Sequence, residues 1–69
     1  MITKNRLREI RQERGIAQQW LAAHAGCSPS KLTSIERYNY LPSRGLRQRI
    51  AEALETTPEE IWPGLDEGD

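Results

Sequence analysis

The stretch that decides the fold runs from Gln18 to Arg37 and reads QQWLAAHAGCSPSKLTSIER. Apolar residues recur at helical spacing on both sides of Gly26, at positions 21, 22 and 25 before it and at 32 and 35 after it. This spacing predicts two short helices, over residues 18–25 and about 28–37, that share one core. Gly26 lies in their connection, where a glycine adopts a positive φ easily. Ser28 and Pro29 suit the first turn of the second helix, because the hydroxyl accepts a backbone N–H and proline lacks one.

The second of these helices has a small, polar surface outside its apolar stripe. The residues left facing outward are Pro29, Ser30, Lys31, Thr33, Ser34 and Arg37. In the first helix, Ala22 lies where the two helices cross, and a larger side chain there would push them apart. A helix that is apolar on one side and small and polar on the other suits the major groove of DNA.

The rest of the chain also has helical periodicity. Leu7 and Ile10 form the stripe of a helix expected over residues 3–14, with Ile2 or Thr3 one turn earlier and Gly15 ending it. A fourth helix is expected to start at Pro42-Ser43, its inner face formed by Leu46, Ile50 and Leu54 with support from Ala53. Thr57-Pro58-Glu59-Glu60 has the pattern of a capping box for a short fifth helix that carries Ile61 and Trp62.

Strand-type alternation is absent from the sequence, so the predicted fold class is all-α, a compact bundle of four to five short helices. We expect one domain over residues 1–63, with the motif at 18–37, and an acidic tail over 64–69. Trp62 has two readings, a residue that seals the core and an anchor for a dimer. For Trp20, we favour packing over the helix expected at residues 3–14, and the alternative is contact with DNA or a partner.

Charge is distributed unevenly along the chain, although the formal net charge is zero. Ten Lys and Arg residues lie between Met1 and Arg49 against three acids, which gives this part a charge of +7. From Ile50 onward there are seven acids and no base, which gives −7. This asymmetry predicts a basic face for a polyanion and an acidic end turned away from it.

The residues that carry enzyme chemistry are scarce. There is one histidine, His24, and one cysteine, Cys27, so we expect His24 to be a surface residue and Cys27 a small core residue. We predict no catalytic residue, no metal and no cofactor, and hence no enzyme. No apolar run is long enough to span a membrane, and a cytoplasmic setting is expected.

On these residues the chain resembles the Cro/phage-repressor family of helix-turn-helix proteins, of the xenobiotic-response-element type. The resemblance covers roughly residues 6–62. RLREIRQERGIAQQWLAAHAGCS is similar to the first two helices of the family, LTSIERYNYLPS to its recognition helix and the loop after it, and IAEALETTPEEIW to its last two helices. The implied fold is that of a lambda-repressor-like DNA-binding domain.

The resemblance also implies roles for single residues. The positions that read DNA bases in the family are occupied in this chain by Pro29, Ser30, Lys31, Thr33 and Ser34. The positions that meet phosphates are occupied by Arg11, Gln18, Arg37, Asn39, Tyr40 and Arg44. Arg11 and Glu36 match a pair that bridges the first and third helices. Three features depart from the pattern of the family. Ala17 replaces a capping residue, and Pro29, Ser30 and Ser34 are short where relatives often have Gln or Arg. Tyr38 replaces a common glycine, where a positive φ would strain it.

The implied function is a sequence-specific DNA-binding transcriptional regulator, a repressor in preference to an activator. Its partner is double-stranded DNA, bound as a homodimer on a palindromic operator with half-sites about 34 Å apart. Because the chain ends soon after the fifth helix, we expect no ligand-sensing domain, so that regulation comes from concentration, dimerisation or a separate protein. Two alternatives stay open: a protein-interaction module of the same fold, and the antitoxin of a toxin–antitoxin pair. The basic first half of the sequence favours DNA.

Overall fold

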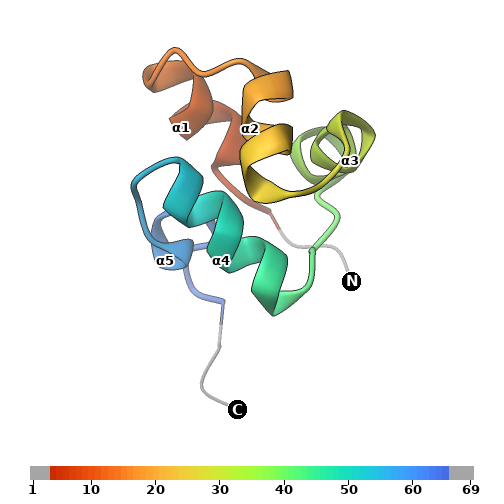
Figure 1. Ribbon diagram of the computed structural model, residues 1–69. Helices are drawn as coiled ribbons and strands as arrows, with labels where there is room; N and C mark the ends of the chain where they lie inside the picture. The colour runs from red at the N-terminus through yellow and green to blue at the C-terminus, as the bar shows by residue number, and fades with distance from the viewer. Residues whose placement is uncertain (1–3, 66–69) are drawn as a thin grey trace.

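A computed structural model describes residues 4–65 of the chain, and its regular elements are all helices. They are α1 (Leu7–Glu13), α2 (Gln18–Ala25), α3 (Pro29–Tyr38), α4 (Arg44–Ala53) and α5 (Pro58–Ile61). Helices α2 and α3 are joined by a tight turn, α4 packs against α2, and α5 lies beside α4 (Figure 1). The predicted all-α fold is confirmed.

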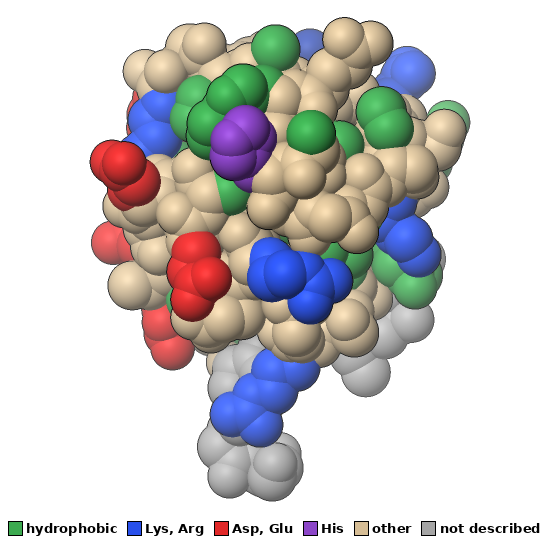
Figure 2. Space-filling model, viewed as in Figure 1, with side chains coloured by type: hydrophobic (Ala, Val, Ile, Leu, Met, Phe, Trp, Pro, Cys, Tyr) green, Lys and Arg blue, Asp and Glu red, His purple; other side chains and the backbone are tan. Residues whose placement is uncertain are grey.

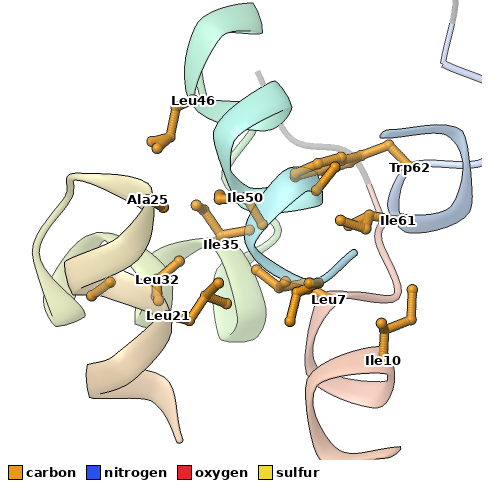
Figure 3. Packing of buried hydrophobic residues seen from close by; sticks show 13 residues of the cluster. Leu7, Ile10, Leu21, Ala25, Leu32, Ile35, Leu46, Ile50, Ile61 and Trp62 are labelled. Atoms are coloured by element: carbon orange, nitrogen blue, oxygen red, sulfur yellow. The ribbon is translucent and has the colours of Figure 1, made fainter. Parts of the chain in front are cut away.

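The core lies between the helices and is made of apolar side chains (Figure 3). Every helix contributes to it, and the buried residues are Leu7, Ile10, Leu21, Ala22, Ala25, Leu32, Ile35, Leu46, Ile50, Ala51, Leu54, Ile61 and Trp62. A fully buried Leu or Ile side chain contributes about 1.5–3 kcal/mol, so this cluster is the main source of stability. Trp62 is only 1% exposed. Of its two readings, this burial favours the core residue over the dimer anchor. In α4 it is Ala51 that is fully buried, whereas Ala53 is half-buried at the edge.

The turns that shape the motif follow from single residues. Gly26 ends α2 in the left-handed conformation, at φ +76°. The Ser28 hydroxyl then accepts the backbone N–H of Lys31 at 3.1 Å and starts α3, and the Ser43 hydroxyl accepts that of Leu46 at 3.3 Å and starts α4. Both hydroxyls satisfy an N–H that has no partner inside the helix.

Helix α1 begins later than its apolar spacing predicted, at Leu7 instead of residue 3. The reason is that the Asn5 side chain makes two hydrogen bonds that hold it outside the helix. Its Oδ1 accepts the N–H of Leu7 at 3.0 Å, and its Nδ2 donates to the carbonyl of Ile35 at 2.9 Å. The N–H of Arg6 donates to the carbonyl of Ile61 at 2.8 Å. Residues 4–6 therefore tie α1 to α3 and α5. The expected contributions of Ile2 and Thr3 lie outside the described residues.

Two other local predictions are wrong. The Thr57 side chain makes no capping hydrogen bond, so the expected capping box is not formed. Helix α5 starts instead with Pro58, whose fixed φ suits a first turn, and the Thr57 carbonyl accepts the N–H of Glu60 at 3.0 Å. The positive φ expected as a strain on Tyr38 falls on Asn39, at +57°, one residue later. Asparagine tolerates this conformation well, and Tyr38 remains the last residue of α3.

Candidate nucleic-acid interface

Arg11 of α1 and Glu36 of α3 form a two-pronged ion pair. Arg11 Nε donates to Glu36 Oε2 at 2.8 Å and Nη2 donates to Oε1 at 3.1 Å. The third prong, Nη1, donates to the carbonyl of Ile16 at 2.8 Å. With side chains only 14% and 4% exposed, this pair is largely shielded from water. It therefore fixes α1, the α1–α2 turn and α3 in one arrangement, as a fork-shaped guanidinium can.

A shallow polar hollow surrounds this ion pair. Its walls are formed by Arg8, Arg11, Gln18, Glu36 and Arg37, from three helices. Three guanidinium groups against one carboxylate make the hollow positively charged. We call these five residues the basic hollow. It brings together three of the residues expected to meet phosphates, which are Arg11, Gln18 and Arg37.

Gln18 is the first residue of α2, at the end of the helix where the dipole is positive. Ala17 precedes it and offers no side-chain hydrogen bond to the first turn, which leaves the N–H groups of that turn without a cap. An uncapped helix N-terminus is suited to an anion. The Thr33 hydroxyl lies 3.5 Å from Oε1 of Gln18 and donates to the carbonyl of Pro29 at 3.1 Å. Thr33 thus faces the start of α2.

A second hollow lies at the start and middle of α3. It is lined by Ser28, Ser30, Lys31, Ser34 and Tyr40, and we call these residues the serine hollow. The ammonium of Lys31 lies 4.9 Å from the ring centre of Tyr40. Three of the expected base readers meet in this hollow, while Pro29 is exposed on the first turn of α3. Tyr40, expected at a phosphate, lies among the base readers.

The remaining expected phosphate contacts lie outside both hollows. Asn39 ends α3, and its N–H donates to the carbonyl of Ser34. Arg44, on the first turn of α4, lines a separate hollow between α4 and α5 together with Arg47 and Glu59. The structure therefore does not bring Arg44 near Arg11 and Gln18.

The exposed side of α3 is open and faces away from the acids. Ser30, Lys31 and Arg37 are exposed. In the view of Figure 2 the acidic side chains gather on the side of α1 and α5, not on that of α3. Arg6 pairs there with Glu9 at 3.2 Å and Glu60 at 3.7 Å. A polyanion would meet Lys31, Arg37 and hydroxyl groups on α3 without approaching these carboxylates.

Comparison with known proteins agrees with this arrangement. A family model described as a helix-turn-helix domain matches residues 5–61. The chain belongs to the helix-turn-helix domain family. The resemblance seen in the motif residues is thus confirmed.

Two relatives of this helix-turn-helix chain cover most of its length. It is 38% identical over 58 residues to the uncharacterized HTH-type transcriptional regulator YazB of Bacillus subtilis (strain 168), a match that covers 84% of each chain. It also resembles the crystal structure of the restriction-modification controller protein C.AhdI from Aeromonas hydrophila. That match has a TM-score of 0.74 and 34% identity, and covers 80% of this chain and 83% of the other.

Three residues of this helix-turn-helix domain were missed by sequence reasoning. Arg8 lines the basic hollow, and its place one turn before Arg11 on the same helix was the available signal. Arg49 of α4 donates from Nε to the carbonyl of Ala25 at 2.8 Å and so caps the end of α2. Asn5 joins α1 to α3 through the carbonyl of Ile35. The last two act across 24 and 30 residues of sequence, so no local pattern announces them.

Trp20, His24 and Cys27 are not part of either hollow. The Trp20 ring is 44% exposed and stacks on His24, with ring centres 3.7 Å apart. The preferred packing of Trp20 over α1 is thus replaced by a stack within α2. Cys27 packs against the core edge, and burial raises the pKa of its thiol, opposed by the nearby charges of Arg49 and Lys31.

Neither a membrane span nor a metal cluster is found in the part of the chain that the structure describes. Within residues 4–65, no helix has the length and apolar character needed to cross a membrane. In the same range, no three His, Cys, Asp or Glu side chains are grouped so that they could hold a metal ion.

Proposed function

We propose that the protein, a DNA-binding transcriptional regulator, inserts α3 into the major groove of double-stranded DNA. The observation that carries this proposal is the position of the basic hollow beside the open polar face of α3. A groove-reading helix needs phosphate-binding groups at its flank to set its depth and register, and base-reading groups on its exposed side. Both are present in this domain on adjoining surfaces.

The phosphate contacts fall to the basic hollow. Arg8, Arg11 and Arg37 supply charge, and Gln18 adds a side-chain amide at the positive end of α2. Because Glu36 holds Arg11 in place, that guanidinium needs little reordering to bind an anion. Asn39 and Arg44, which lie outside both hollows, and Tyr40, which lies in the serine hollow, add further phosphate contacts. Contacts of this kind position the protein but do not read sequence.

Base reading falls to Ser30, Lys31 and Ser34 in the serine hollow, with Pro29 offering an apolar contact and Thr33 lying nearer Gln18. Serine side chains are short and cannot make the two-pronged contacts that discriminate bases by about 1–3 kcal/mol each. Bridging water and the shape of the DNA therefore supply part of the specificity.

We further propose that two copies bind a palindromic operator as a homodimer, with half-sites one helical turn, about 34 Å, apart. The protein would act in the cytoplasm as a repressor that occupies its operator. A protein-interaction module or an antitoxin is the competing role, and the short side chains of α3 are what favour it.

Selection of bound sequences from a random duplex pool tests this function. We expect enrichment of a palindrome with half-sites one turn apart. Gln18→Ala should weaken binding of the dimer to every duplex by about 100-fold, because each of the two protomers loses one hydrogen bond to a charged group. Gln12→Ala, at an exposed residue of α1 that lines neither the basic hollow nor the serine hollow, serves as the control and should bind as the wild type does. A pool that shows no enrichment would reject the proposal and favour a protein partner.

A further inference from the structure

We infer that Tyr40 is a positioning residue for Lys31, and that the pair makes the protein prefer guanine at one position of each half-site. This inference rests on the proposed function and adds to it the base that is read. The starting observation is the contact between the two side chains: the Lys31 ammonium lies 4.9 Å from the centre of the Tyr40 ring. That distance is within the range of a cation–π interaction.

Tyr40 is itself fixed to the helix that carries Lys31. Its backbone N–H donates to the carbonyl of Ser34, in the middle of α3, at 3.1 Å. This bond follows the left-handed turn at Asn39, which brings the chain back alongside the helix. The backbone of Tyr40 is therefore held beside α3, which keeps the ring next to Lys31, although the residue is 40% exposed.

Lys31 has no carboxylate partner in the described range. The ion pairs of Arg6 with Glu9 and Glu60, and of Arg11 with Glu36, do not involve it. A lysine side chain has four flexible carbons, so without a partner its ammonium would sample many positions. The ring of Tyr40 restricts these positions to the space above the serine hollow, on the open side of α3.

The chemistry of an ammonium selects the base. It has three donors and no acceptor. Guanine presents two neighbouring acceptors, O6 and N7, to the major groove, whereas adenine places a donor beside its N7, cytosine presents a donor, and thymine has one acceptor next to a methyl group. Ser30 and Ser34 either donate or accept, so their hydroxyls do not oppose this preference. Guanine is therefore the base whose acceptors best match the donors of the Lys31 ammonium.

The test uses the full chain and the duplex selected from the random pool. Each guanine is replaced in turn by 7-deazaguanine, which lacks the N7 acceptor, or by adenine in a full base-pair exchange. For the wild type, the replacement of one particular guanine in each half-site should weaken binding. The same replacement should leave the affinity of Lys31→Ala unchanged. At that position, Tyr40→Leu should lower the preference for guanine over adenine by about two- to fivefold, as expected for an exposed cation–π contact.

Tyr40→Phe is the matched variant, because it keeps the ring and removes the hydroxyl. It should retain the full guanine preference, even if loss of a phosphate contact weakens its binding to all duplexes. The double variant Lys31→Ala, Tyr40→Leu should discriminate no less than Lys31→Ala alone. Melting temperatures of all variants show whether the fold is kept. If Tyr40→Leu unfolds, the guanine preferences of Tyr40→Phe and Lys31→Ala test the inference.

Several outcomes would overturn the inference while leaving the proposed function intact. One is that the wild type binds its duplex, but 7-deazaguanine weakens the binding of the wild type and of Lys31→Ala by the same factor. Another is a folded Tyr40→Leu that keeps the full preference, or a Tyr40→Phe that loses it. A wild type that binds no duplex at all would instead refute the proposed function itself.

Discussion

Between about 50 and 200 mM salt, the affinity of the protein for its selected duplex is expected to fall by about 10²-fold. Each protomer offers two arginines of the basic hollow, Arg8 and Arg37, because the charge of the third, Arg11, is already balanced by Glu36. Two protomers on a palindrome would then neutralise about four phosphates and release their counterions, which corresponds to a slope of about −4 in a plot of log affinity against log salt. A fluorescence-anisotropy titration at several salt concentrations measures this slope.

Single arginine variants assign the slope to the basic hollow. Arg37→Gln removes one cation per protomer and should reduce the magnitude of the slope by about two in the dimer. Arg14→Gln, at an exposed residue just after α1 that lines neither hollow, is the matched control and should leave the slope unchanged. A nearly flat salt response of the wild type, or an equal effect of both variants, would show that the hollow does not hold phosphates.

Arg11→Met should lower the free energy of unfolding by about 3 kcal/mol. The change leaves the Glu36 carboxylate, whose side chain is only 4% exposed, without its partner, and it also removes the bond to the Ile16 carbonyl. An unpaired buried charge is more harmful than the pair is beneficial. Since a domain of this size has a total stability of a few kcal/mol, much of the population should unfold. Urea denaturation followed by circular dichroism measures the change.

The double variant Arg11→Met, Glu36→Met distinguishes a buried pair from a surface pair. Replacing both charges with apolar side chains removes the unpaired carboxylate, so most of the lost stability should return. If Arg11→Met alone costs less than about 1 kcal/mol, the pair behaves like an exposed one. In that case Arg11 does not orient α1 against α3.

Much of the fold could be predicted because it depends on local patterns. The spacing of Leu32 and Ile35 in α3, or of Leu46 and Ile50 in α4, marks the buried side of a helix directly. Ser28 also announces a helix start, since its hydroxyl caps the turn that follows it. What was predicted wrongly depends on contacts distant in sequence. Residues 4–6 were assigned to α1 by pattern, but Asn5 is bound to Ile35 instead.

The candidate site was predictable to the same extent. The motif indicated which side of α3 faces outward, and the structure shows Ser30 and Lys31 exposed there. The grouping of these residues was not predictable, because it depends on how the chain turns after α3. The left-handed residue at Asn39 brings Tyr40 next to Lys31, and the sequence alone suggested Tyr38 for that conformation. Arg8 was missed although it lies one turn before Arg11 on the same face of α1, a local signal that the sequence contained.

The most direct test of the central claim, that the open face of α3 lies against DNA, is the affinity of Ser30→Glu for the selected duplex. Ser30 is exposed near the start of α3. A carboxylate at this end of a helix interacts favourably with the helix dipole, so the fold should be kept. Ala23→Glu introduces the same charge at an exposed residue of α2. We expect Ser30→Glu to bind about 100-fold more weakly, because like charges in an interface repel by several kcal/mol, and Ala23→Glu to bind nearly as the wild type. Equal affinities for the two variants would contradict the claim.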